Sequence, residues 1–416
     1  QFAYSKGRGG RDALLFLTLH WLLAFSDHRR VALFCSDVKG AFDHVPAERL
    51  LLKAQLLGVH PILLRVLESW LSGRTARVVV GGDFSDLFRI CNSVFQGTVW
   101  GPRLWNLFFG DARYAVNGLG FIDSLYADDL NCFKLFDQQH SDAAVMHRLA
   151  ECQSELHVWG AANQVVFDPG KESLHILDPV RPVGDSFRIL GVLFDTRLTM
   201  KDAVMEIAAQ AHVRLQTVLR THRYNSVAET VRLYKSFVLS FIEHATPAIH
   251  HAVPFVLEAL ERVQNSFLDT LHLSKLEALT TFKLAPLSTR RDIAMLGFLH
   301  RFSHGKAPPC FNDVLQMGTA AALPRQLRQG SFHDLQIRDV IDGSQPRQLE
   351  RSVLGLVYSF NCLPSDVAVQ PDVACFQRCL QRGVVRAARR DRANWENLLR
   401  DEVRCSSVAS FQAWFI

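Results

Sequence analysis

The stretch SLYADDLNCF, from Ser124 to Phe133, places two adjacent aspartates, Asp128 and Asp129, inside an apolar run. Burying a carboxylate is costly unless it is paired or bound to a metal, and two neighbouring carboxylates repel each other by about 4 kcal/mol at about 4 Å and an effective dielectric of about 20. Because aspartate favours tight turns, the stretch predicts a strand, a turn and a second strand. A divalent cation is the simplest way to stabilise such a turn.

A third carboxylate, Asp37, follows another apolar run, VALFCSDV at residues 31–38. Such a run is typical of a buried strand that ends at a cleft. Strands distant in sequence are often neighbours in a sheet, so Asp37, Asp128 and Asp129 are predicted to meet at one end of it. Three carboxylates suit two Mg²⁺ or Mn²⁺ ions, which can promote an in-line displacement at phosphorus. The alternative, that each is an ordinary turn or cap aspartate, stays open, most of all for Asp37.

The composition is that of a globular protein. The chain has 416 residues, 48% of them hydrophobic and 21% charged, enough for two or three domains. Its net charge of +5 permits a polyanionic partner without requiring one. Nine cysteines, an odd number without CxxC spacing, support neither a zinc knuckle nor a disulfide framework and fit a reducing compartment. Because the first residue is Gln1, the chain is expected to be a fragment.

The order of local patterns predicts a mixed first half and a helical second half. Beyond about residue 201 the apolar residues follow helical spacing, and the Gly and Pro content of HGKAPPCF at 304–311 predicts a linker. In the first half the patterns predict helices over Ala13–Phe25, 46–58 and 101–109, and a hairpin over 77–90 that turns at Gly81-Gly82-Asp83.

Four stretches in chain order resemble the motifs of reverse transcriptases. YADD at 126–129 is similar to the catalytic box, and SDVKGAFDHV at 36–45 to the first aspartate motif. FQGTVWGPRLWNLFF at 95–109 resembles the Gln-Gly loop and its following helix. FRILGVLFD at 187–195 resembles the hairpin that holds the primer terminus. Each motif is a modest signal, and four in this order make a strong one.

Within the reverse transcriptase family, the sequence resembles the enzymes of non-LTR, LINE-like retrotransposons. QFAYSKGRGGRDAL at 1–14 resembles the segment just before the first aspartate motif of those elements, and stretches within 233–309 resemble their helical region. The chain is therefore identified as a reverse transcriptase fragment that starts just before that motif. Past residue 310 the resemblance is looser.

The resemblance implies an α+β fold: a polymerase right-hand palm, with an antiparallel sheet packed on helices, followed by helical regions. Its expected domains are 1–195 (palm with the rear part of the fingers), 196–305 (thumb-like) and 306–416 (C-terminal). The implied activity is RNA-directed DNA synthesis with dNTPs, an RNA template and a DNA primer or target. It also implies an intracellular enzyme whose site of action is the nucleus, with no membrane association and no metal knuckle in this fragment.

The same resemblance assigns residue roles. Asp37, Asp128 and Asp129 would be the metal ligands, and Lys171 in DPGKES a charge partner or proton donor for the pyrophosphate. Substrate contacts are expected from Phe42, the steric gate against a ribose 2′-hydroxyl, and from Gln96, Gly97, Tyr126, Arg8 and Arg11. Leu190 and Gly191, at the tip of the 187–195 hairpin, are expected to contact nucleic acid.

Several of these residues could instead have a structural or surface role. Phe42 could be a core residue, and Lys171, Arg8 and Arg11 could be solvated surface residues. Phe95 stands where a proline is commoner in the family and Trp100 where an aliphatic residue is, and both substitutions are expected to alter the Gln-Gly loop without removing its chemistry. The whole chain could be an inactive relic that binds nucleic acid, or a different palm enzyme acting on free nucleotides, although GGDF at 81–84 reads as a hairpin and not as a cyclase signature.

Two further features lie in the second half. Arg378, Arg382, Arg386 and Arg389 follow helical spacing, with Arg390 and Arg392 beyond them. Such a stripe can neutralise phosphates, and a solvated helix face is an equally good explanation. The pair His250-His251 has no ligand spacing and is expected on a loop surface.

Overall fold

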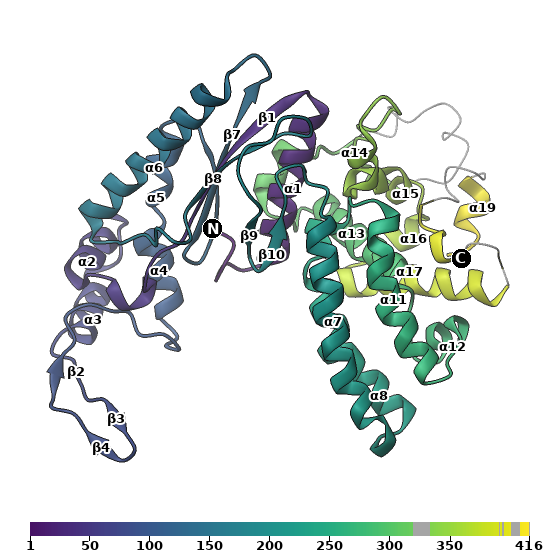
Figure 1. The fold of residues 1–416 in the computed structure, drawn as a ribbon, viewed down its shortest axis with the longest axis horizontal. Coiled ribbons are helices and arrows are strands. Elements are labelled where there is room, and N and C mark those ends of the chain that lie inside the picture. The colour runs from purple at the N-terminus through teal and green to yellow at the C-terminus, as the bar shows by residue number, and fades with distance from the viewer. Residues whose placement is uncertain (319–332, 391, 393–394, 401–407, 416) are drawn as a thin grey trace. The chain divides into compact units, whose positions relative to one another are not determined.

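The computed structural model describes residues 1–318, 333–390, 392, 395–400 and 408–415 (Figure 1). The chain forms two compact units. Unit 1 consists of Gln1–Ala13 and His28–Leu190, and unit 2 of Leu14–Asp27 and Gly191–Ile416. The helix α1, Gly10–Ser26, therefore begins in unit 1 and continues in unit 2.

The centre of unit 1 is a four-stranded sheet with the order β6-β7-β1-β8. Its strands are β1 (Arg29–Ser36), β6 (Ile122–Tyr126), β7 (Asp129–Asp137) and β8 (Ser173–Leu177), and every neighbouring pair is antiparallel. Ser36 pairs with Leu130, so the residue after β1, Asp37, lies beside the turn between β6 and β7. This register confirms that the two aspartate-bearing strands are neighbours.

The sheet of unit 1 is covered by helices that the sequence pattern largely predicts. In β1 all residues after Arg29 are buried, as expected of a central strand. The helix α6, Asp142–Asn163, packs on β1 and β8 through a buried stripe at a spacing of three to four residues. The remaining helices of unit 1 are α2 (Ala47–Leu56), α3 (Pro61–Leu71), α4 (Gly101–Phe109) and α5 (Ala112–Asn117).

The predicted hairpin over 77–90 is present. The strands β3 (Val79–Val80) and β4 (Asp83–Phe84) pair, and so do β2 (Thr75–Ala76) and β5 (Phe88–Arg89). The turn itself consists of Gly81 and Gly82, whose φ angles of 62° and 97° are readily adopted by glycine, while Asp83 already pairs with Val80.

A second short turn lies where the two units divide. Between β9 (Phe187–Ile189) and β10 (Val192–Phe194), the residues Leu190 and Gly191 have φ angles of 50° and 80°. Two successive positive φ angles are the signature of a tight hairpin turn. The hairpin expected over 187–195 is therefore formed.

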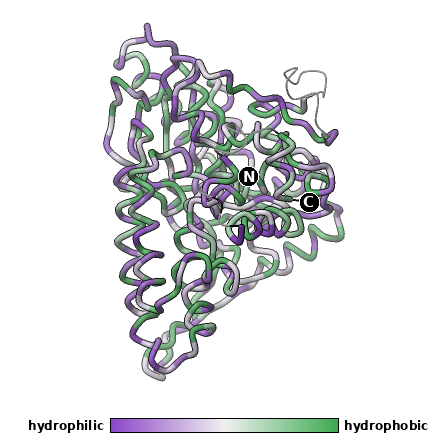
Figure 2. Tube along the Cα trace, turned by 90° about the vertical axis from the view of Figure 1, so that its right-hand side faces the viewer, coloured by the Kyte–Doolittle hydropathy of each residue, from purple (hydrophilic) through white to green (hydrophobic). Residues whose placement is uncertain are grey.

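Unit 2 is helical in its described residues after β10. Within it α7 packs on α11, and α13 packs on α17. Figure 2 shows hydrophobic and hydrophilic residues alternating along the long helices, as amphipathic packing requires. Its helices are α7 (Lys201–Thr221), α8 (Val227–Leu233), α9 (Ser240–His244), α10 (Thr246–Ile249), α11 (Pro254–Thr270), α12 (Lys275–Thr280), α13 (Leu287–Ser303), α14 (Arg347–Arg351), α15 (Val357–Asn361), α16 (Ser365–Ala368), α17 (Val373–Arg389) and α19 (Val408–Gln412).

The predicted thumb-like and C-terminal regions both fall in unit 2, so the boundary expected near residue 305 remains a prediction. No helix in the described part of the chain is long and apolar enough to cross a lipid bilayer.

Candidate active site

The turn between β6 and β7 is strained and tightly held. Tyr126 pairs with Asp129, which leaves Ala127 and Asp128 as the turn, and Ala127 has a φ of 56°. The Ala127 carbonyl accepts hydrogen bonds from Trp105 Nε1 at 2.9 Å and from Gln1 Nε2 at 3.3 Å, and its N–H donates to Gln1 Oε1 at 3.0 Å. Backbone strain of about 1 kcal/mol persists only where the surroundings fix it, and it clusters at functional sites. The sequence predicted both aspartates in the turn, whereas Asp129 is the first residue of β7.

Three carboxylates lie near this turn with little compensating charge. Burial, and then the negative charge of Asp37, raises the pKa of Asp128. Burial, followed by the charges of Asp128 and Asp37, raises the pKa of Asp129 to about 6. Lys171 Nζ lies 2.5 Å from Asp37 Oδ2. Unlike most turn or cap aspartates, these side chains are partly buried and repel one another.

The donor chemistry of this cluster fits a divalent cation. Carboxylate oxygens are the ligands that Mg²⁺ prefers, and a cation would offset the repulsion that raises the pKa of Asp128 and Asp129. In the described residues, however, no three His, Cys, Asp or Glu side chains are already arranged to enclose a metal ion. The structure therefore gives a suitable donor set and not a metal geometry.

A cavity of about 630 Å³ has Asp37 and Asp128 in its wall, whereas Asp129 is not among its lining residues. This volume is in the range of about 300–1,000 Å³ that is typical of small-molecule sites. Six residues predicted for the site line it: Asp37, Phe42, Gln96, Gly97, Asp128 and Lys171. The other lining residues had no predicted role: Tyr4, Val38, Gly40, Ala41 and Pro102. The fold thus brings together residues from five separate stretches of unit 1.

Phe42 is both a core residue and part of the cavity wall. Its ring stacks on Trp105 at a centroid distance of 5.6 Å and meets the edge of Tyr4 at 6.3 Å. The Phe42 carbonyl accepts a hydrogen bond from Val94 N at 2.8 Å. The two readings of Phe42 are therefore compatible, because a ring fixed on one side by the core can present its other side to a substrate.

The Gln-Gly loop is held by a glycine turn and by contacts of its neighbouring residues. Gly97 has a φ of 80°, which requires glycine or a strained substitute. Phe95 packs beneath the guanidinium of Arg74 at 4.9 Å, and Thr98 Oγ1 accepts a hydrogen bond from Gly101 N at the start of α4. Phe95 thus has a packing role in this chain.

Lys171 lies on a loop that is anchored to the end of β1. Asp168 N donates to the Asp37 carbonyl at 3.0 Å. The next residue, Glu172, has a buried carboxylate that accepts hydrogen bonds from Gln153 Nε2 at 2.8 Å and from Ser36 Oγ at 3.3 Å, and it lies 2.9 Å from His157 Nε2. These bonds fix the loop, so the ammonium of Lys171 is directed to Asp37 although its side chain is 63% exposed.

The other predicted site residues lie away from this cavity or are not tested by it. Tyr126, Arg8 and Arg11 are not among the residues that line it, and Arg8 Nη1 donates to the Gln1 carbonyl at 3.2 Å. The nucleic-acid contacts expected of Leu190 and Gly191 remain predictions. The sequence missed Gln1, Tyr4 and Trp105, since only the tertiary fold brings them to the turn and the gate.

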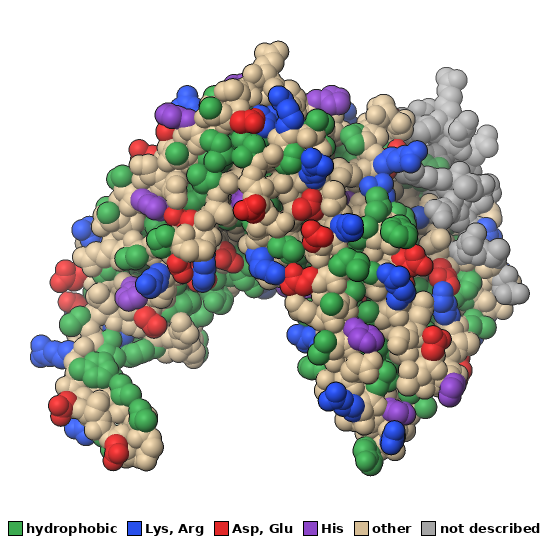
Figure 3. Space-filling view, viewed as in Figure 1, with side chains coloured by type: hydrophobic (Ala, Val, Ile, Leu, Met, Phe, Trp, Pro, Cys, Tyr) green, Lys and Arg blue, Asp and Glu red, His purple; other side chains and the backbone are tan. Residues whose placement is uncertain are grey.

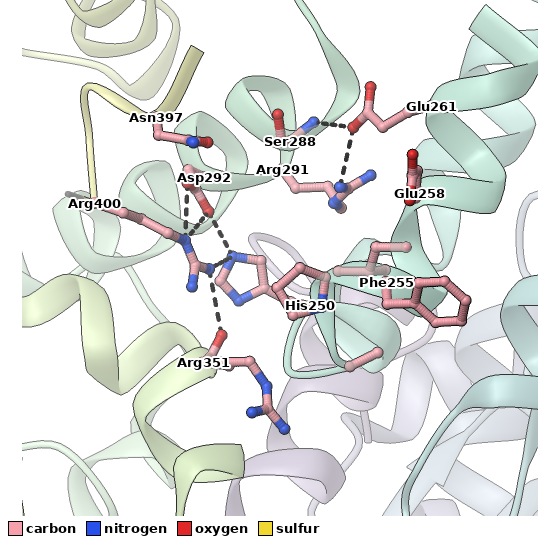
Figure 4. A pocket seen from close by; sticks show the side chains of 13 residues that line it. His250, Phe255, Glu258, Glu261, Ser288, Arg291, Asp292, Arg351, Asn397 and Arg400 are labelled. Carbon is pink, nitrogen blue, oxygen red and sulfur yellow. Dashed lines mark hydrogen bonds and ion pairs between the residues drawn. The ribbon is translucent and has the colours of Figure 1, made fainter. Parts of the chain in front are cut away.

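Unit 2 contains a second cavity, of about 430 Å³, which is shown in Figure 4. Asp292 at its wall lies 2.9 Å from Arg400 Nε and 3.0 Å from His250 Nε2. Burial alone would raise the pKa of Asp292, but Arg400 and His250 outweigh it, so the pKa is lowered. The expectation that His250-His251 lies on a loop surface is wrong: both side chains are buried, with His251 Nε2 2.9 Å from the Leu198 carbonyl.

The charges around this second cavity are largely paired with one another. Glu261 accepts hydrogen bonds from Ser288 N at 2.6 Å and from Arg291 Nη2 at 3.2 Å, so it both caps α13 and neutralises Arg291. Figure 4 shows these bonds joining α11 to α13, and Asp292 to Arg400. We interpret the network as a structural connection between helices.

Comparison with known proteins agrees with the geometry of unit 1. The family model for reverse transcriptase (RNA-dependent DNA polymerase) matches residues 1–194. The chain is 25% identical over 223 residues to the RNA-directed DNA polymerase from mobile element jockey of Drosophila funebris, covering 49% of this chain and 24% of that protein. It is 26% identical over 236 residues to the probable RNA-directed DNA polymerase from transposon BS of Drosophila melanogaster, covering 52% and 26%.

These matches span about a quarter of the length of each relative. They confirm the family that the motifs indicated, and the antiparallel sheet of unit 1 agrees with the palm that this family implies. Residues 1–194 therefore match the reverse transcriptase family model, and the chain is similar to the RNA-directed DNA polymerases of two Drosophila mobile elements.

Proposed function

We propose that this chain is the RNA-directed DNA polymerase of a non-LTR retrotransposon. In the reaction, the 3′-hydroxyl of a primer attacks the α-phosphorus of a dNTP, a new phosphodiester bond forms and pyrophosphate leaves. The observation that supports it best is the single cavity lined by Asp37, Asp128, Lys171 and Phe42 in a domain of the reverse transcriptase family.

Each side chain of the cavity would have its own role in this reaction. Asp37 and Asp128, with Asp129 beside them, would hold two Mg²⁺ or Mn²⁺ ions, which when bound lower the pKa of the attacking hydroxyl and stabilise the leaving oxygen. Lys171 would offset charge on the pyrophosphate or give it a proton. Gly97 lets the backbone approach the incoming nucleotide, with Gln96 beside it, and Phe42 excludes a ribose 2′-hydroxyl by its bulk.

The wider organisation is part of the same proposal. Residues 1–195 would form a right-hand palm with the rear part of the fingers, and the helices of 196–305 and 306–416 would form a thumb-like and a C-terminal region. The partners would be an RNA template, a DNA primer or target and dNTPs. The nucleus would be the site of action.

Primer extension on an RNA template with Mg²⁺ tests the proposal. The chain should extend the primer, and the double variant Asp128→Ala, Asp129→Ala should lose extension by at least about a thousandfold, since metal-held charge supplies much of the rate enhancement. The matched control is Asp83→Ala, Asp86→Ala, which removes two exposed aspartates near the β3–β4 turn and should retain extension.

Two outcomes would contradict the proposal. Equal extension by the chain and its Asp128, Asp129 variant would show that the carboxylates do not carry the reaction. Salt-sensitive binding of nucleic acid without extension on RNA or DNA templates would favour the inactive relic instead.

A further inference from the structure

A positively charged groove lies between α12 and α17 within unit 2. The two helices pack together, and Gln381 Nε2 donates to the Lys283 carbonyl at 3.3 Å. The groove has a volume of about 410 Å³. Five cationic side chains line it: Arg378, Arg382, Arg386 and Arg389 from α17, and Lys283 from the segment after α12.

The arginines occupy one face of an amphipathic helix. On the opposite face Phe376, Leu380 and Val384 are buried in unit 2, which fixes the rotation of α17. The four arginines are exposed and recur every three or four residues. At about 1.5 Å of rise per residue they cover about 16 Å along the helix, long enough to follow several successive phosphates of a strand.

The groove differs from an ordinary solvated helix face because no acidic side chain is among the described residues that line it, although Asp372, the N-cap residue of α17, contributes to raising the pKa of Arg378 after the hydrogen bond to Cys375. No aspartate or glutamate occurs in α17 itself. In the described part of the chain, none of the five cations makes an ion pair. By contrast, acidic and basic side chains are interspersed on the face shown in Figure 3.

Further basic residues lie near the groove, at Lys235 and beyond the end of α17. The pKa of Lys235 is lowered, first by burial and then by the charges of Arg290 and Lys283. Arg390 and Arg392, predicted to extend the stripe, do not line the groove and lie over the ring of Trp414 at 5.5 and 5.1 Å, while Arg386 donates a hydrogen bond to the Trp414 carbonyl at 3.4 Å. The usable stripe is therefore the one that faces Lys283.

We propose that the groove between α12 and α17 binds the sugar–phosphate backbone of a nucleic acid. Guanidinium groups bind phosphate oxygens in a bidentate manner, and a row of them without carboxylate partners releases counterions on binding. Their present hydrogen bonds are weak ones to Cys375, Cys379 and the Trp414 carbonyl. No aromatic side chain is among the described lining residues, so bases have no stacking platform and binding should be independent of sequence. The inference rests on the proposed polymerase function for its choice of polyanion, and it adds a binding surface made of residues outside the polymerase cavity.

The test is the salt dependence of binding to a labelled 20-base-pair DNA duplex of arbitrary sequence, measured by fluorescence anisotropy on the full chain. Arg382→Glu with Arg389→Glu should lower the slope of log K against log salt by about 2 and weaken binding by at least about tenfold at moderate salt. The matched control is Arg220→Glu with Arg223→Glu, the same change of charge at exposed positions in and just after α7, which should reproduce neither effect.

Further measurements separate nucleic-acid binding in the groove from the polymerase activity and from the binding of other polyanions. The variant Asp128→Ala, Asp129→Ala should bind the duplex with the wild-type slope even though extension is lost. An unchanged slope in the groove variant, an equal loss in the control variant, or no duplex binding by the wild type would each overturn the proposal. So would a groove variant that loses binding to phosphatidylserine vesicles and keeps duplex binding, because the ligand would then be a lipid headgroup.

Discussion

Two groups of buried carboxylates in this molecule have opposite electrostatic environments. At the β6–β7 turn of unit 1, burial and mutual repulsion raise the pKa of Asp128 and Asp129. In unit 2 Asp292 is more deeply buried, yet its pKa is lowered, because Arg400 and His250 surround it. A carboxylate that stabilises the fold is paired with cationic side chains of the protein. A carboxylate that takes part in a reaction lacks such partners and can pair with a bound cation or with the substrate.

The comparison explains how the two sites can be told apart without a ligand. Burial alone does not separate them, since both groups lie in low-dielectric surroundings. The two groups differ in the charges that surround them. At the turn Lys171 reaches Asp37, while the backbone of Ala127 is held in a strained conformation by Gln1 and Trp105. Strain and uncompensated charge at one place indicate a functional site.

The largest stability effect is expected from breaking the compensated group. Asp292→Ala would leave Arg400 without its partner, and removing one member of a buried ion pair costs about 3–5 kcal/mol. Urea unfolding followed by circular dichroism should show this loss. The control Asp202→Ala, at an exposed position in the first turn of α7, should stay within about 1 kcal/mol. Similar losses in both variants would contradict the special role of the network.

Acid should weaken unit 2 through its buried histidines. Burial, and then Arg400, lowers the pKa of His250 to about 4, and burial lowers that of His251 to about 4. The unfolded state therefore takes up protons first, so stability is full above about pH 6.5 and falls as the pH drops towards 4. At about pH 5 each histidine should cost about 2 kcal/mol.

Urea unfolding at neutral pH and at about pH 5 measures this dependence. A His250→Gln variant, whose side chain does not titrate, should lose about half of it. If the variant and the wild type fall equally with pH, His250 is not a source of the acid sensitivity.

A smaller effect is expected where Trp105 links the gate to the turn. Trp105→Phe keeps the stacking on Phe42 but removes the hydrogen bond to the Ala127 carbonyl. The loss of one buried hydrogen bond should cost about 1–2 kcal/mol and should lower kcat more than it changes KM for dNTP. A variant that raises KM alone would show that the bond positions substrate rather than the turn.

The smallest effect tests the gate itself. Phe42→Val should raise the ratio of rNTP to dNTP incorporation by about tenfold, because it opens room beside the ribose 2′ position. The ratio is measured within one preparation, so any loss of folded protein cancels. Val38→Ala, at another residue lining the cavity, is the matched control and should leave the ratio unchanged. An unchanged ratio for Phe42→Val would remove Phe42 from the gate.

The sequence predicted those parts of the site that depend on local pattern and strand order. Asp37 and Asp128 each follow an apolar run, and antiparallel pairing of β1 with β7 brings them together. It could not predict Tyr4 or Trp105 at the site, because their contacts depend on the packing of α4 and the first residues against the turn.

The error at His250 has the same origin. Its burial depends on Asp292, 42 residues further along the chain, and on Arg400, 150 residues further along. A pair of histidines gives no local indication of such distant partners. The sequence alone therefore predicted a surface position for them. The arginine stripe was visible from its spacing, whereas the facing Lys283 and the lack of acid across the groove needed the fold.

The contrast between the two groups of carboxylates is tested most directly by measuring stability and activity together in Asp129→Asn and Asp292→Asn. The account predicts that Asp129→Asn keeps or raises the urea midpoint, since it relieves repulsion, and loses RNA-templated extension. It predicts that Asp292→Asn lowers the midpoint and that the protein remaining folded still extends the primer. An Asp129→Asn variant that is destabilised like Asp292→Asn, or that still extends normally, would contradict it.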